Sequence, residues 1–379
     1  MESEFIIVGA GPAGSTLAYE LASQGRKVLL LDKSKFPRPK TCAGGLNFRT
    51  LRLLPFDLGA IIEKYITGIN FTRRLVSPIL RRSPEPFMAT LLREHFDYFL
   101  IRQAQEKGAI FYEQTQLYSI YQDEMGVEVE TSAGQFRAKF LVGADGAQSQ
   151  VAKKLDLAKE NSYILTFHSE IPRALFSEQA EDIVHIDWGS LKRSYAYLFP
   201  KKNHFALGAG GYQIPALLIK KYQRSFLFSH WQKEEKSLPF SSAGFLLPLR
   251  QKRSPLQKGR SLLIGDAAGL IDPFTGEGLY SAIRSAQICA PLLLEGLQRN
   301  WSSLKPCQEA IDSYLMPELE CARLFREFFN LAPSFFHWKV TTNERWWQAM
   351  VKVLKGDKNF LDINRKLGPL GSLLLKLAK

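Results

Sequence analysis

The chain of 379 residues has few cysteines and no long apolar segment. Its four cysteines (Cys42, Cys289, Cys307 and Cys321) lack the paired spacing of a metal site, so we expect free thiols in a reducing compartment and no bound metal. No uninterrupted apolar run approaches the roughly 18 residues that span a bilayer, and the chain opens on a strand-like run rather than on a signal peptide. These absences favour a cytoplasmic protein, with peripheral association with a membrane as an open alternative.

Acidic residues are also scarce relative to basic ones. The chain has 37 Asp and Glu against 50 Lys and Arg, a formal net charge of +13. A balance this basic suits nucleic acid, an anionic membrane surface or an acidic ligand. There is no dense Lys/Arg block, which argues against a nucleic-acid-binding arm. The length suggests two domains, or one large domain with an insertion.

The first thirty-odd residues predict a βαβ unit. In order they contain an apolar run (5–8), a glycine pattern (Gly9, Gly11 and Gly14), a helical segment (15–24) and a second apolar run (27–31) that ends at Asp32. Gly9 permits a tight turn, Gly11 lets backbone approach a pyrophosphate, and Gly14 lets helix and strand pack closely. The helix N-terminus offers free N–H groups to the phosphates, and Asp32 can accept hydrogen bonds from a ribose. The sequence therefore predicts a dinucleotide cofactor at this turn.

Two further strand–turn–helix patterns follow. The first, at 143–149, contains Asp145 and Gly146, and the second, at 265–269, contains Gly265, Asp266 and Ala267 before Pro273, Gly276, Gly278 and Leu279. Asp266 can bond a ribityl or ribose hydroxyl. A helix that begins near Leu279 would direct its N-terminal dipole at a reduced flavin ring, whereas a simple dehydrogenase needs neither pattern. Ser149 is also a fair helix N-cap, and we prefer Glu277 as a solvated cap over a proton relay.

The residue pattern changes in the middle of the chain. Strand-like runs are expected at 65–74, 79–82, 109–111, 116–121, 127–131, 136–142, 164–170, 183–188, 194–199 and 204–209, and helices at 90–105, 216–233 and 279–296. The run from 162 to 249 is typical of a separate antiparallel sheet with one helix. Its aromatic residues suit either core packing or a large apolar ligand. A structural role is the default for its His168, His185 and His204.

Taken together, these motifs resemble the FAD-dependent oxidoreductases of the para-hydroxybenzoate hydroxylase type. The resemblance covers roughly the first 300 residues and includes Arg93, which matches an arginine that contacts FAD in that group. It implies an α/β fold: a Rossmann-like FAD-binding domain, an antiparallel-sheet α+β substrate domain and C-terminal helices. The expected division is 1–65, 85–160 and 250–300 for FAD, 66–84 and 161–249 for substrate, and 301–379 for the helical region.

Two stretches narrow the resemblance to the geranylgeranyl reductases, which saturate polyprenyl double bonds. The loop Phe36-Pro37-Arg38-x-Lys40-x-Cys42-x-Gly44-Gly45 resembles theirs, and Tyr195-x-Tyr197-x-Phe199-Pro200 resembles their Tyr-x-Trp-x-Phe-Pro motif, with Tyr197 in place of tryptophan. Flavin-dependent halogenases share the Pro-Arg part of the loop. Their Trp-x-Trp-x-Ile-Pro motif is absent, so the halogenase hypothesis is less favoured.

The resemblance implies a full set of site residues. FAD is expected at Gly9, Gly11, Pro12, Ala13, Gly14, Asp32, Lys33, Arg38, Cys42, Ala43, Gly44, Arg93, Asp145, Gly146, Gly265, Asp266, Ala267, Pro273, Gly276, Gly278 and Leu279. Cys42, Gly44, Gly45 and Tyr195 are expected at the reacting centre. Tyr195, Tyr197, Phe199 and Pro200 are expected to line the substrate site. Arg38 or Lys40 would activate the Cys42 thiol.

The implied reaction uses NADPH or a reduced carrier to reduce FAD, which then delivers hydride to a polyprenyl lipid or polyprenyl diphosphate. Two other classes stay open: an aromatic or quinone-precursor monooxygenase on the same FAD frame, and a lipid carrier in which FAD is structural. The basic C-terminal tail with Trp338, Trp346 and Trp347 fits either a membrane-surface element or a helical cap packed on the core.

Overall fold

The computed structural model describes residues 2–173, 182–229, 241–251 and 254–363. They divide into two compact units, each described by itself. The first unit comprises Met1–Pro39, Glu94–Ser162 and Leu247–Glu320, and the second comprises Lys40–Arg93, Tyr163–Leu246 and Cys321–Lys379. The division predicted from the sequence stays a prediction.

A largely parallel sheet forms the first unit. Among the described residues it has eight strands, in the order β17-β18-β11-β1-β2-β8, with β10 and β9 continuing antiparallel from β11. Their bounds are β1 Glu2–Val8, β2 Val28–Leu31, β8 Ile110–Tyr112, β9 Leu117–Gln122, β10 Val127–Thr131, β11 Gly134–Gly143, β17 Gln257–Lys258 and β18 Ser261–Leu263. The central strands are apolar throughout because helices cover them, as parallel sheets require.

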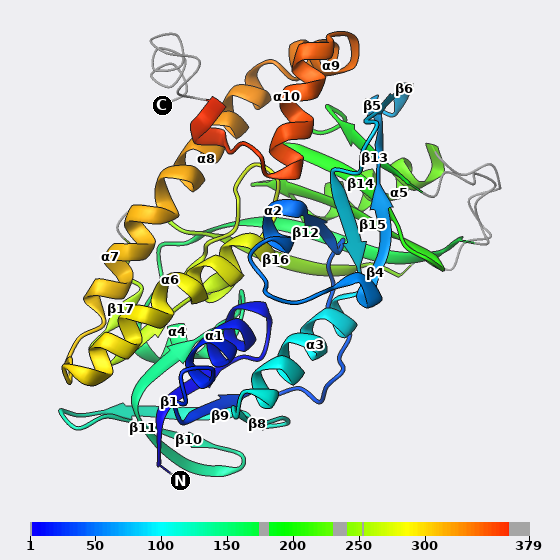
Figure 1. The fold of residues 1–379 in the computed structure, drawn as a ribbon. Coiled ribbons are helices and arrows are strands. Elements are labelled where there is room, and N and C mark those ends of the chain that lie inside the picture. The colour runs from blue at the N-terminus through cyan, green and yellow to red at the C-terminus, as the bar shows by residue number, and fades with distance from the viewer. Residues whose placement is uncertain (1, 174–181, 230–240, 252–253, 364–379) are drawn as a thin grey trace. The chain divides into compact units, whose positions relative to one another are not determined.

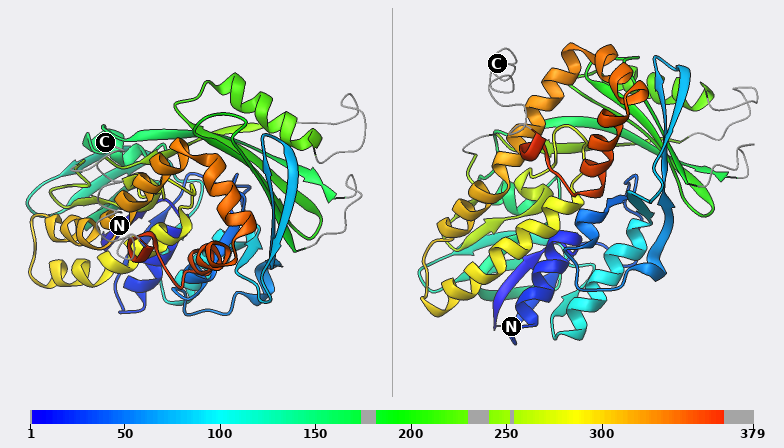
Figure 2. Two further views of the ribbon diagram at one scale, coloured as in Figure 1. Left: turned by 90° about the horizontal axis from the view of Figure 1, so that it is seen from above. Right: turned by 45° about the horizontal axis from the view of Figure 1, so that its top comes forward.

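The helices of this unit lie over that sheet, with α1 and α6 side by side (Figures 1 and 2). Their bounds are α1 Pro12–Ala22, α3 Arg93–Glu106, α4 Gln150–Leu155, the 3-10 turn η4 Gly265–Ala268, α6 Leu279–Gln298 and α7 Lys305–Tyr314. The apolar positions of α1 and α6 are buried against β1, so that Phe5, Leu17 and Ile6 are fully enclosed. This core fixes the strand ends that carry the cofactor motifs.

The second unit contains two sheets. Its described residues form a seven-stranded sheet, β16-β12-β15-β14-β13-β5-β6, and a three-stranded sheet, β3-β7-β4. Their bounds are β3 Gly45–Asn47, β4 Ile62–Ile66, β5 Gly68–Arg73, β6 Val76–Arg82, β7 Met88–Leu91, β12 Ser162–Pro172, β13 Ile183–Trp188, β14 Ser194–Pro200, β15 His204–Tyr212 and β16 Ala243–Leu249. In the larger sheet the pairs β12–β15, β15–β14, β14–β13 and β5–β6 are antiparallel, and β13 runs parallel to β5.

Helices pack on both faces of the larger sheet. Their bounds are α2 Phe48–Leu51, the 3-10 turn η1 Gly59–Ile61, α5 Ala216–Ser229, α8 Met316–Leu331, α9 Pro333–Thr342 and α10 Glu344–Lys355. Helix α5 covers one face through Ile219 and Phe226. On the other face α10 inserts Trp347, which is fully buried edge-on against Phe71 and Phe87 and donates from Nε1 to the Arg82 carbonyl at 3.0 Å. Within the described residues, α10 is thus a cap packed on the core at Trp347.

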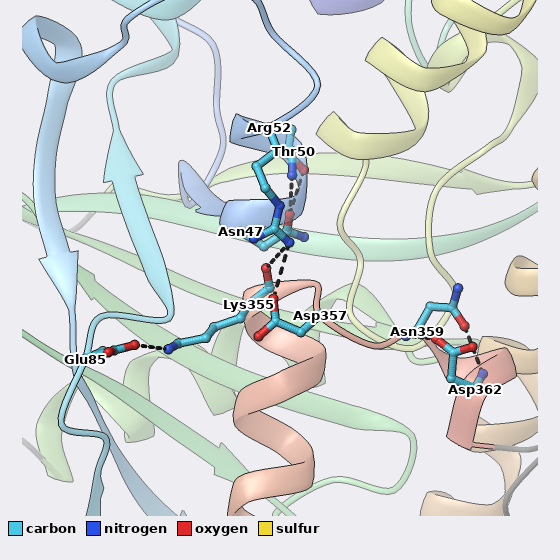
Figure 3. A network of polar contacts seen from close by, with 8 residues as sticks. All are labelled: Asn47, Thr50, Arg52, Glu85, Lys355, Asp357, Asn359 and Asp362. Atoms are coloured by element: carbon cyan, nitrogen blue, oxygen red, sulfur yellow. Dashed lines mark hydrogen bonds and ion pairs between the residues drawn. The ribbon is translucent and has the colours of Figure 1, made fainter.

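Polar contacts tie the end of α10 to the segment around α2 (Figure 3). Arg52 donates to the Lys355 carbonyl at 3.2 Å and lies 3.5 Å from the Asp357 carboxylate. Lys355 in turn donates to Glu85 at 2.7 Å. Exposed pairs of this kind contribute little individually, so the buried Trp347 is the stronger anchor of α10.

Several predicted boundaries were wrong. The helix predicted at 15–24 begins at Pro12, because the glycine turn passes directly into it. The strand predicted at 65–74 is two strands in different sheets, with Tyr65 in β4 paired to Ala89. The break between the strand-like runs predicted at 65–74 and 79–82 lies at Arg74 and Leu75, both in the left-handed region, and β6 starts at Val76.

The helix predicted at 90–105 begins at Arg93. Thr90 belongs to β7 because it pairs with Gly45, where the loop predicted after Asp32 becomes β3. The helix predicted at 216–233 is described to Ser229, and the rest of that range lies outside the described residues. The pairings in β3, β5 and β7 are long-range contacts, which local patterning does not reveal.

Candidate functional site

The predicted cofactor turns of the first unit lie at one edge of its sheet. Strands β2, β1, β11 and β18 are parallel neighbours, and Val8 pairs with both Leu31 and Gly143, while Gly143 pairs with Leu263. The carboxyl ends of these strands therefore coincide. The three turns and Asp32 follow those ends, which is where open α/β sheets bind ligands.

The turns are in contact with one another. Gly9 has φ +105°, and a Cβ on it would lie 2.6 Å from the Asp145 Cα. Gly265 has φ +59°, and its Cβ would lie 2.9 Å from the Ala13 methyl. Both positions exclude a side chain, because φ is positive and because the space is occupied by the backbone of the second turn at Gly9 and by the Ala13 methyl at Gly265. The first, second and third motifs thus form one surface.

Gly11 and Gly146 have a different environment. A Cβ on either would meet nothing within 4 Å. The φ of +79° accounts for glycine at Gly146, whereas neither φ nor neighbouring protein atoms account for it at Gly11. Gly11 is the N-cap of α1, Pro12 follows it, and the first turn of the helix has no acidic residue. Open space before a helix N-terminus free of acidic side chains fits a pyrophosphate. The residues present therefore suit the ADP part of FAD.

Asp32 has a structural task at this edge. Its carboxylate accepts hydrogen bonds from the Ala10 N–H and the Ser34 N–H, each at 2.8 Å, and it is 8% exposed. It therefore fixes the glycine turn against the end of β2. A carboxylate has further acceptor capacity, so the ribose contact remains a prediction, as does a contact from the exposed Lys33.

Asp145 caps helix α4. It accepts from Ser149 Oγ at 2.5 Å and from the backbone N–H groups of Gln150 and Val151 at 2.6 and 3.2 Å. Burial raises the pKa of this carboxyl, and the hydrogen bonds oppose that rise. Ser149 is the N-cap, as predicted, and accepts from the Ala152 N–H at 2.9 Å. A direct role for Asp145 toward the cofactor stays a prediction.

The loop before α6 is shaped by Asp272, which sequence reasoning did not single out. Its Oδ1 accepts from the N–H groups of Phe274 and Thr275 at 2.9 and 2.7 Å, and burial raises its pKa. This loop presents Pro273, Gly276 and Gly278. Glu277 accepts from the Tyr280 N–H at 2.7 Å, which is the helix-capping role predicted for it. Asp272-Pro is a turn-forming pair, a signal that was available in the sequence.

Asp266 lies next to Gly278 within the first unit. A Cβ on Gly278 would meet the Asp266 carboxylate at 3.0 Å. Ala267 is buried in the same turn, and Leu279 opens α6 directly after Gly278. The predicted third motif and the α6 N-terminus are therefore brought together, and their contacts with the ribityl and ring parts of a flavin stay predictions.

Arg38, predicted to meet the cofactor or to activate Cys42, has other partners. Its Nη2 lies 3.5 Å from the carboxylate of Asp97, which is fully buried on α3, and its guanidinium covers the Phe36 ring at 4.8 Å. Lys40 lies over the Phe245 ring at 5.2 Å. The ion pair with a buried carboxylate is costly to break, which gives Arg38 a structural role. The predicted contacts of Arg38 with FAD, and of Arg38 or Lys40 with Cys42, stay predictions.

The second unit brings the two geranylgeranyl reductase-like stretches together. The loop folds back at Gly44, whose φ is +65° and whose N–H is 3.3 Å from the Cys42 Sγ. The Leu91 N–H donates to the Gly44 carbonyl at 2.9 Å. A Cβ on Gly45 would lie 2.7 Å from the Phe199 ring, so glycine permits this close approach. Cys42 and Ala43 are half-buried beside the motif on β14.

The β14 motif forms an aromatic row. The Tyr195 and Tyr197 rings are 6.0 Å apart, and Phe199 stands perpendicular to Tyr197 at 5.3 Å. Their partners on β15 are small: Gly210, Gly208 and Ala206. A side chain on Gly208 would collide with the Tyr197 ring, which therefore leans across β15. Pro200 ends the strand and accepts from Thr90 Oγ1 at 2.9 Å.

Lys201, directly after this motif, is a second residue that sequence reasoning missed. It is 1% exposed, its Nζ donates to the Leu91 carbonyl at 2.7 Å, and a Cβ on Gly44 would collide with it. Burial lowers the pKa of Lys201 to about 8, while the nearby Cys42, Glu63 and Glu170 act in the opposite direction. From the sequence alone, a lysine at the end of a strand is expected to be solvated, and only the fold shows that this side chain is enclosed.

Arg93, the first residue of α3, is half-buried in the same unit.

His168 lies on the same side of this sheet. It pairs with Gly208, which also pairs with Tyr197. Neither ring nitrogen has a hydrogen-bond partner among the described residues, and burial lowers its pKa to about 4, with smaller effects from Lys201 and His204. By contrast, His185 contacts Asn70 at 3.3 Å and His204 lies 4.0 Å from Glu170. A structural role fits all three.

Comparisons with known proteins agree with this geometry. Residues 2–185 match the family model described as FAD binding domain. A digeranylgeranylglycerophospholipid reductase of Methanopyrus kandleri is 28% identical over 355 residues, 85% of this chain and 89% of the relative. A geranylgeranyl diphosphate reductase of Synechocystis sp. is 27% identical over 313 residues, 76% of this chain and 74% of the relative.

Solved structures share the fold. A geranylgeranyl bacteriochlorophyll reductase-like protein of Thermoplasma acidophilum aligns with a TM-score of 0.75 at 23% identity, over 87% of this chain and 88% of that one. A flavin-dependent brominase aligns with a TM-score of 0.76 at 20% identity, over 94% of each chain. At these identities the likeness concerns the fold alone.

Over residues 2–185 the chain has the FAD-binding domain of the FAD-dependent oxidoreductase class, and its described residues share the fold of solved flavoprotein reductases and halogenases. Within that class it is related by sequence to the geranylgeranyl reductases, which confirms the resemblance predicted from its motifs. Among the described residues, no helix is both long enough and apolar enough to span a membrane.

Proposed function

We propose that this protein is an FAD-dependent reductase that saturates carbon–carbon double bonds of a polyprenyl substrate. The observation that carries the proposal is the meeting, in the second unit, of the Cys42–Gly45 loop with the aromatic row of Tyr195, Tyr197 and Phe199. An isolated alkene offers no polar handle. Its orientation therefore depends on apolar contact area, which an aromatic row beside small residues supplies.

Each part of the chain has a task in this reaction. The turns at Gly9–Gly14, the Asp145 turn and the Asp266 turn would hold FAD, which when bound supplies the hydride. The absence of a side chain at Gly44 and Gly45 lets the loop backbone lie close to Lys201 and Phe199, with which a Cβ would collide. The aromatic row would orient the alkene and exclude water, which raises the effective concentration of the reacting groups.

The electron donor and the head group of the substrate belong to the same proposal. NADPH or a reduced carrier would reduce the flavin. The relatives' printed names refer to geranylgeranyl diphosphate and to a digeranylgeranyl phospholipid. Both have anionic heads, which suits a chain with a net charge of +13.

An anaerobic reoxidation experiment tests the proposal. The purified protein is photoreduced without oxygen, and geranylgeranyl diphosphate or a geranylgeranyl phospholipid is added. The flavin absorbance should return in step with a product whose mass is raised by two hydrogens per double bond. Reoxidation by oxygen alone, with no hydrogenated product, would contradict it.

One alternative has an observation in its favour. The fold that this chain shares with the flavin-dependent brominase covers 94% of the chain, and monooxygenases bind FAD on the same fold. An aromatic or quinone-precursor monooxygenase would consume oxygen with NADPH and give a hydroxylated product. The Trp-x-Trp-x-Ile-Pro motif of halogenases is absent, because Tyr195 and Tyr197 occupy the tryptophan positions. We therefore favour the reductase.

Peripheral membrane association would complete this function, because long prenyl chains partition into lipid. Helices α8 to α10 expose Leu331, Phe335, Trp338 and Trp346 at 68%, 40%, 55% and 37%. Lys339 lies over the Trp338 ring at 4.3 Å. Exposed tryptophan beside lysine is the composition of an interfacial helix. We propose that this surface, called here the α9 aromatic patch, contacts an anionic membrane.

A further inference from the structure

Lys201 has the environment of a functional rather than a structural lysine. Its ammonium is enclosed within the second unit, and it makes a single hydrogen bond, to the Leu91 carbonyl at 2.7 Å, with acceptors of the described residues. No carboxylate of those residues lies within 4.0 Å of its Nζ, so it has no direct counter-ion there. A buried charge without an ion pair is expensive, and such groups concentrate at functional sites.

The position of the ammonium is fixed from two sides. It occupies the space that a side chain on Gly44 would need, and the Leu91 residue that accepts from it also donates to the Gly44 carbonyl. The ammonium is therefore held against the turn that carries Cys42, and this neighbour acts to raise the pKa of Lys201. Of the four cysteines, Cys42 is the one that is not buried.

The other charged and titratable groups around Lys201 come from the elements packed against it. Glu63 on β4 accepts from the Lys202 N–H at 3.0 Å, and Glu170 on β12 is exposed and 4.0 Å from His204. Arg173 donates to the Lys201 carbonyl at 3.4 Å and keeps its charge throughout this pH range. His168, with a pKa of about 4, is neutral near pH 7. Desolvation raises the pKa of Tyr197, which stays protonated there. Lys201 is therefore the buried group of this cluster that can exchange a proton between pH 7 and 9.

Resting on the proposed function, we propose that Lys201 is the proton reservoir of the reduction and acts through the thiol of Cys42. Saturating a double bond needs a hydride and a proton. The thiol gives its proton to the second alkene carbon, so that a C–H bond forms as the S–H bond breaks. The ammonium then restores the thiol, with an S–H bond formed and an N–H bond broken, and the neutral amine recovers its proton from water.

The first readout is a pH profile of the steady-state reduction of geranylgeranyl diphosphate under continuous anaerobic photoreduction, because every turnover after the first needs the thiol restored. Because the pKa of Lys201 is about 8, the wild-type rate should be level from pH 6.5 to 7.5 and fall above pH 8. Lys201→Met should be at least tenfold slower at pH 7 and level from pH 7 to 9. Lys202→Met, next in sequence but 54% exposed, is the matched control and should keep the wild-type profile.

The second readout needs no substrate. Alkylation of Cys42 by iodoacetamide is followed by mass spectrometry in the purified flavoprotein, with Cys42→Ser as the blank. A neighbouring ammonium stabilises negative charge on sulfur, so wild type should react several-fold faster than Lys201→Met at pH 7.5. The two rates should converge above pH 9, where the wild-type amine is neutral. Lys201→Gln replaces Lys201→Met if the latter does not fold, as judged by circular dichroism.

The outcomes separate this proposal from the proposed function. Equal alkylation rates at pH 7.5, or a wild-type pH profile in Lys201→Met, would overturn the role of Lys201 even if the protein reduces prenyl chains. If the wild-type protein reduces no prenyl substrate, the proposed function is overturned. The alkene then cannot be the group that receives the proton, whatever the alkylation rates are.

Discussion

The Ala10 N–H donates a hydrogen bond of 2.8 Å to the carboxylate of Asp32. This bond joins the glycine turn after β1 to the end of β2, and the same carboxylate accepts from the Ser34 N–H. From the sequence, an acid at this position is predicted to bind a ribose, whereas in the structure its carboxylate stabilises the glycine turn. A contact with the cofactor would be additional to this structural role.

Asp32→Asn should therefore weaken both the fold and FAD binding. The asparagine amide would direct a donor at one of the two N–H groups, which leaves a buried donor unsatisfied at a cost of about 1–3 kcal/mol. We expect the dissociation constant for FAD to rise at least tenfold and the melting temperature to fall. Fluorescence titration of the apoprotein and calorimetry measure these. Asp156→Asn, at an exposed acid of the same unit, should change neither; equal effects at both positions would count against the argument.

Gly44→Ala should be far more damaging than Gly25→Ala. Both glycines have a positive φ, +65° and +70°, which costs alanine roughly 1–2 kcal/mol. A Cβ at Gly25 meets nothing within 4 Å, whereas at Gly44 it collides with the Leu91 carbonyl and Lys201. We expect about 1 kcal/mol for Gly25→Ala and about 3 kcal/mol or more for Gly44→Ala, measured by urea unfolding. Similar losses would mean that the loop relaxes freely.

His168 should make the protein less stable in mild acid. Its folded pKa of about 4 lies below the ordinary value of 6.5, so the unfolded chain takes up the proton first as the pH falls. The free energy of unfolding should drop by about 2 kcal/mol between pH 8 and pH 5 from this residue. His168→Leu should remove that part of the pH dependence, whereas His95→Gln, at a half-exposed ring, should leave it unchanged. An unaltered slope in His168→Leu would refute the assignment.

Cys42→Ala should separate turnover from cofactor binding. The thiol is half-buried at the turn that meets the aromatic row, and its removal creates little empty space. FAD should stay bound, as judged by the flavin spectrum of the gel-filtered protein, while prenyl reduction falls at least tenfold. Cys321→Ala, at a buried thiol 3.2 Å from the Phe360 carbonyl, should leave turnover intact. Unchanged turnover in Cys42→Ala would mean that Cys42 contributes only to packing.

The α9 aromatic patch should carry membrane binding. Replacing Trp338 and Trp346 together by alanine removes exposed aromatic surface, so we expect co-sedimentation with phosphatidylglycerol vesicles to fall several-fold without loss of melting temperature. Tyr121→Ala removes a ring that is 63% exposed in the other unit and should have no effect. Binding that survives the double substitution would place the membrane contact elsewhere.

Much of the first unit could be predicted from the sequence. The glycine turn, the strand ends and the helix from Leu279 are local: each depends on residues within a few positions, and an apolar run followed by glycine defines it. Parallel β1, β11 and β18 then have their carboxyl ends at one edge, so the turns at Gly9, Asp145 and Asp266 meet there. The second unit was less predictable because β3, β4 and β7 are short strands formed by pairing with distant segments.

The sequence by itself determined the class of protein, because FAD binding depends on short backbone motifs whose geometry is encoded locally. Only the tertiary structure decided which side chains share an environment. Lys201 and Gly44 are far apart in the chain, yet the Lys201 ammonium fills the space beside Gly44. Asp32 turned out to hold a turn, and Arg38 to pair with Asp97. Burial and charge are properties of neighbours in space, and a linear pattern contains no record of them.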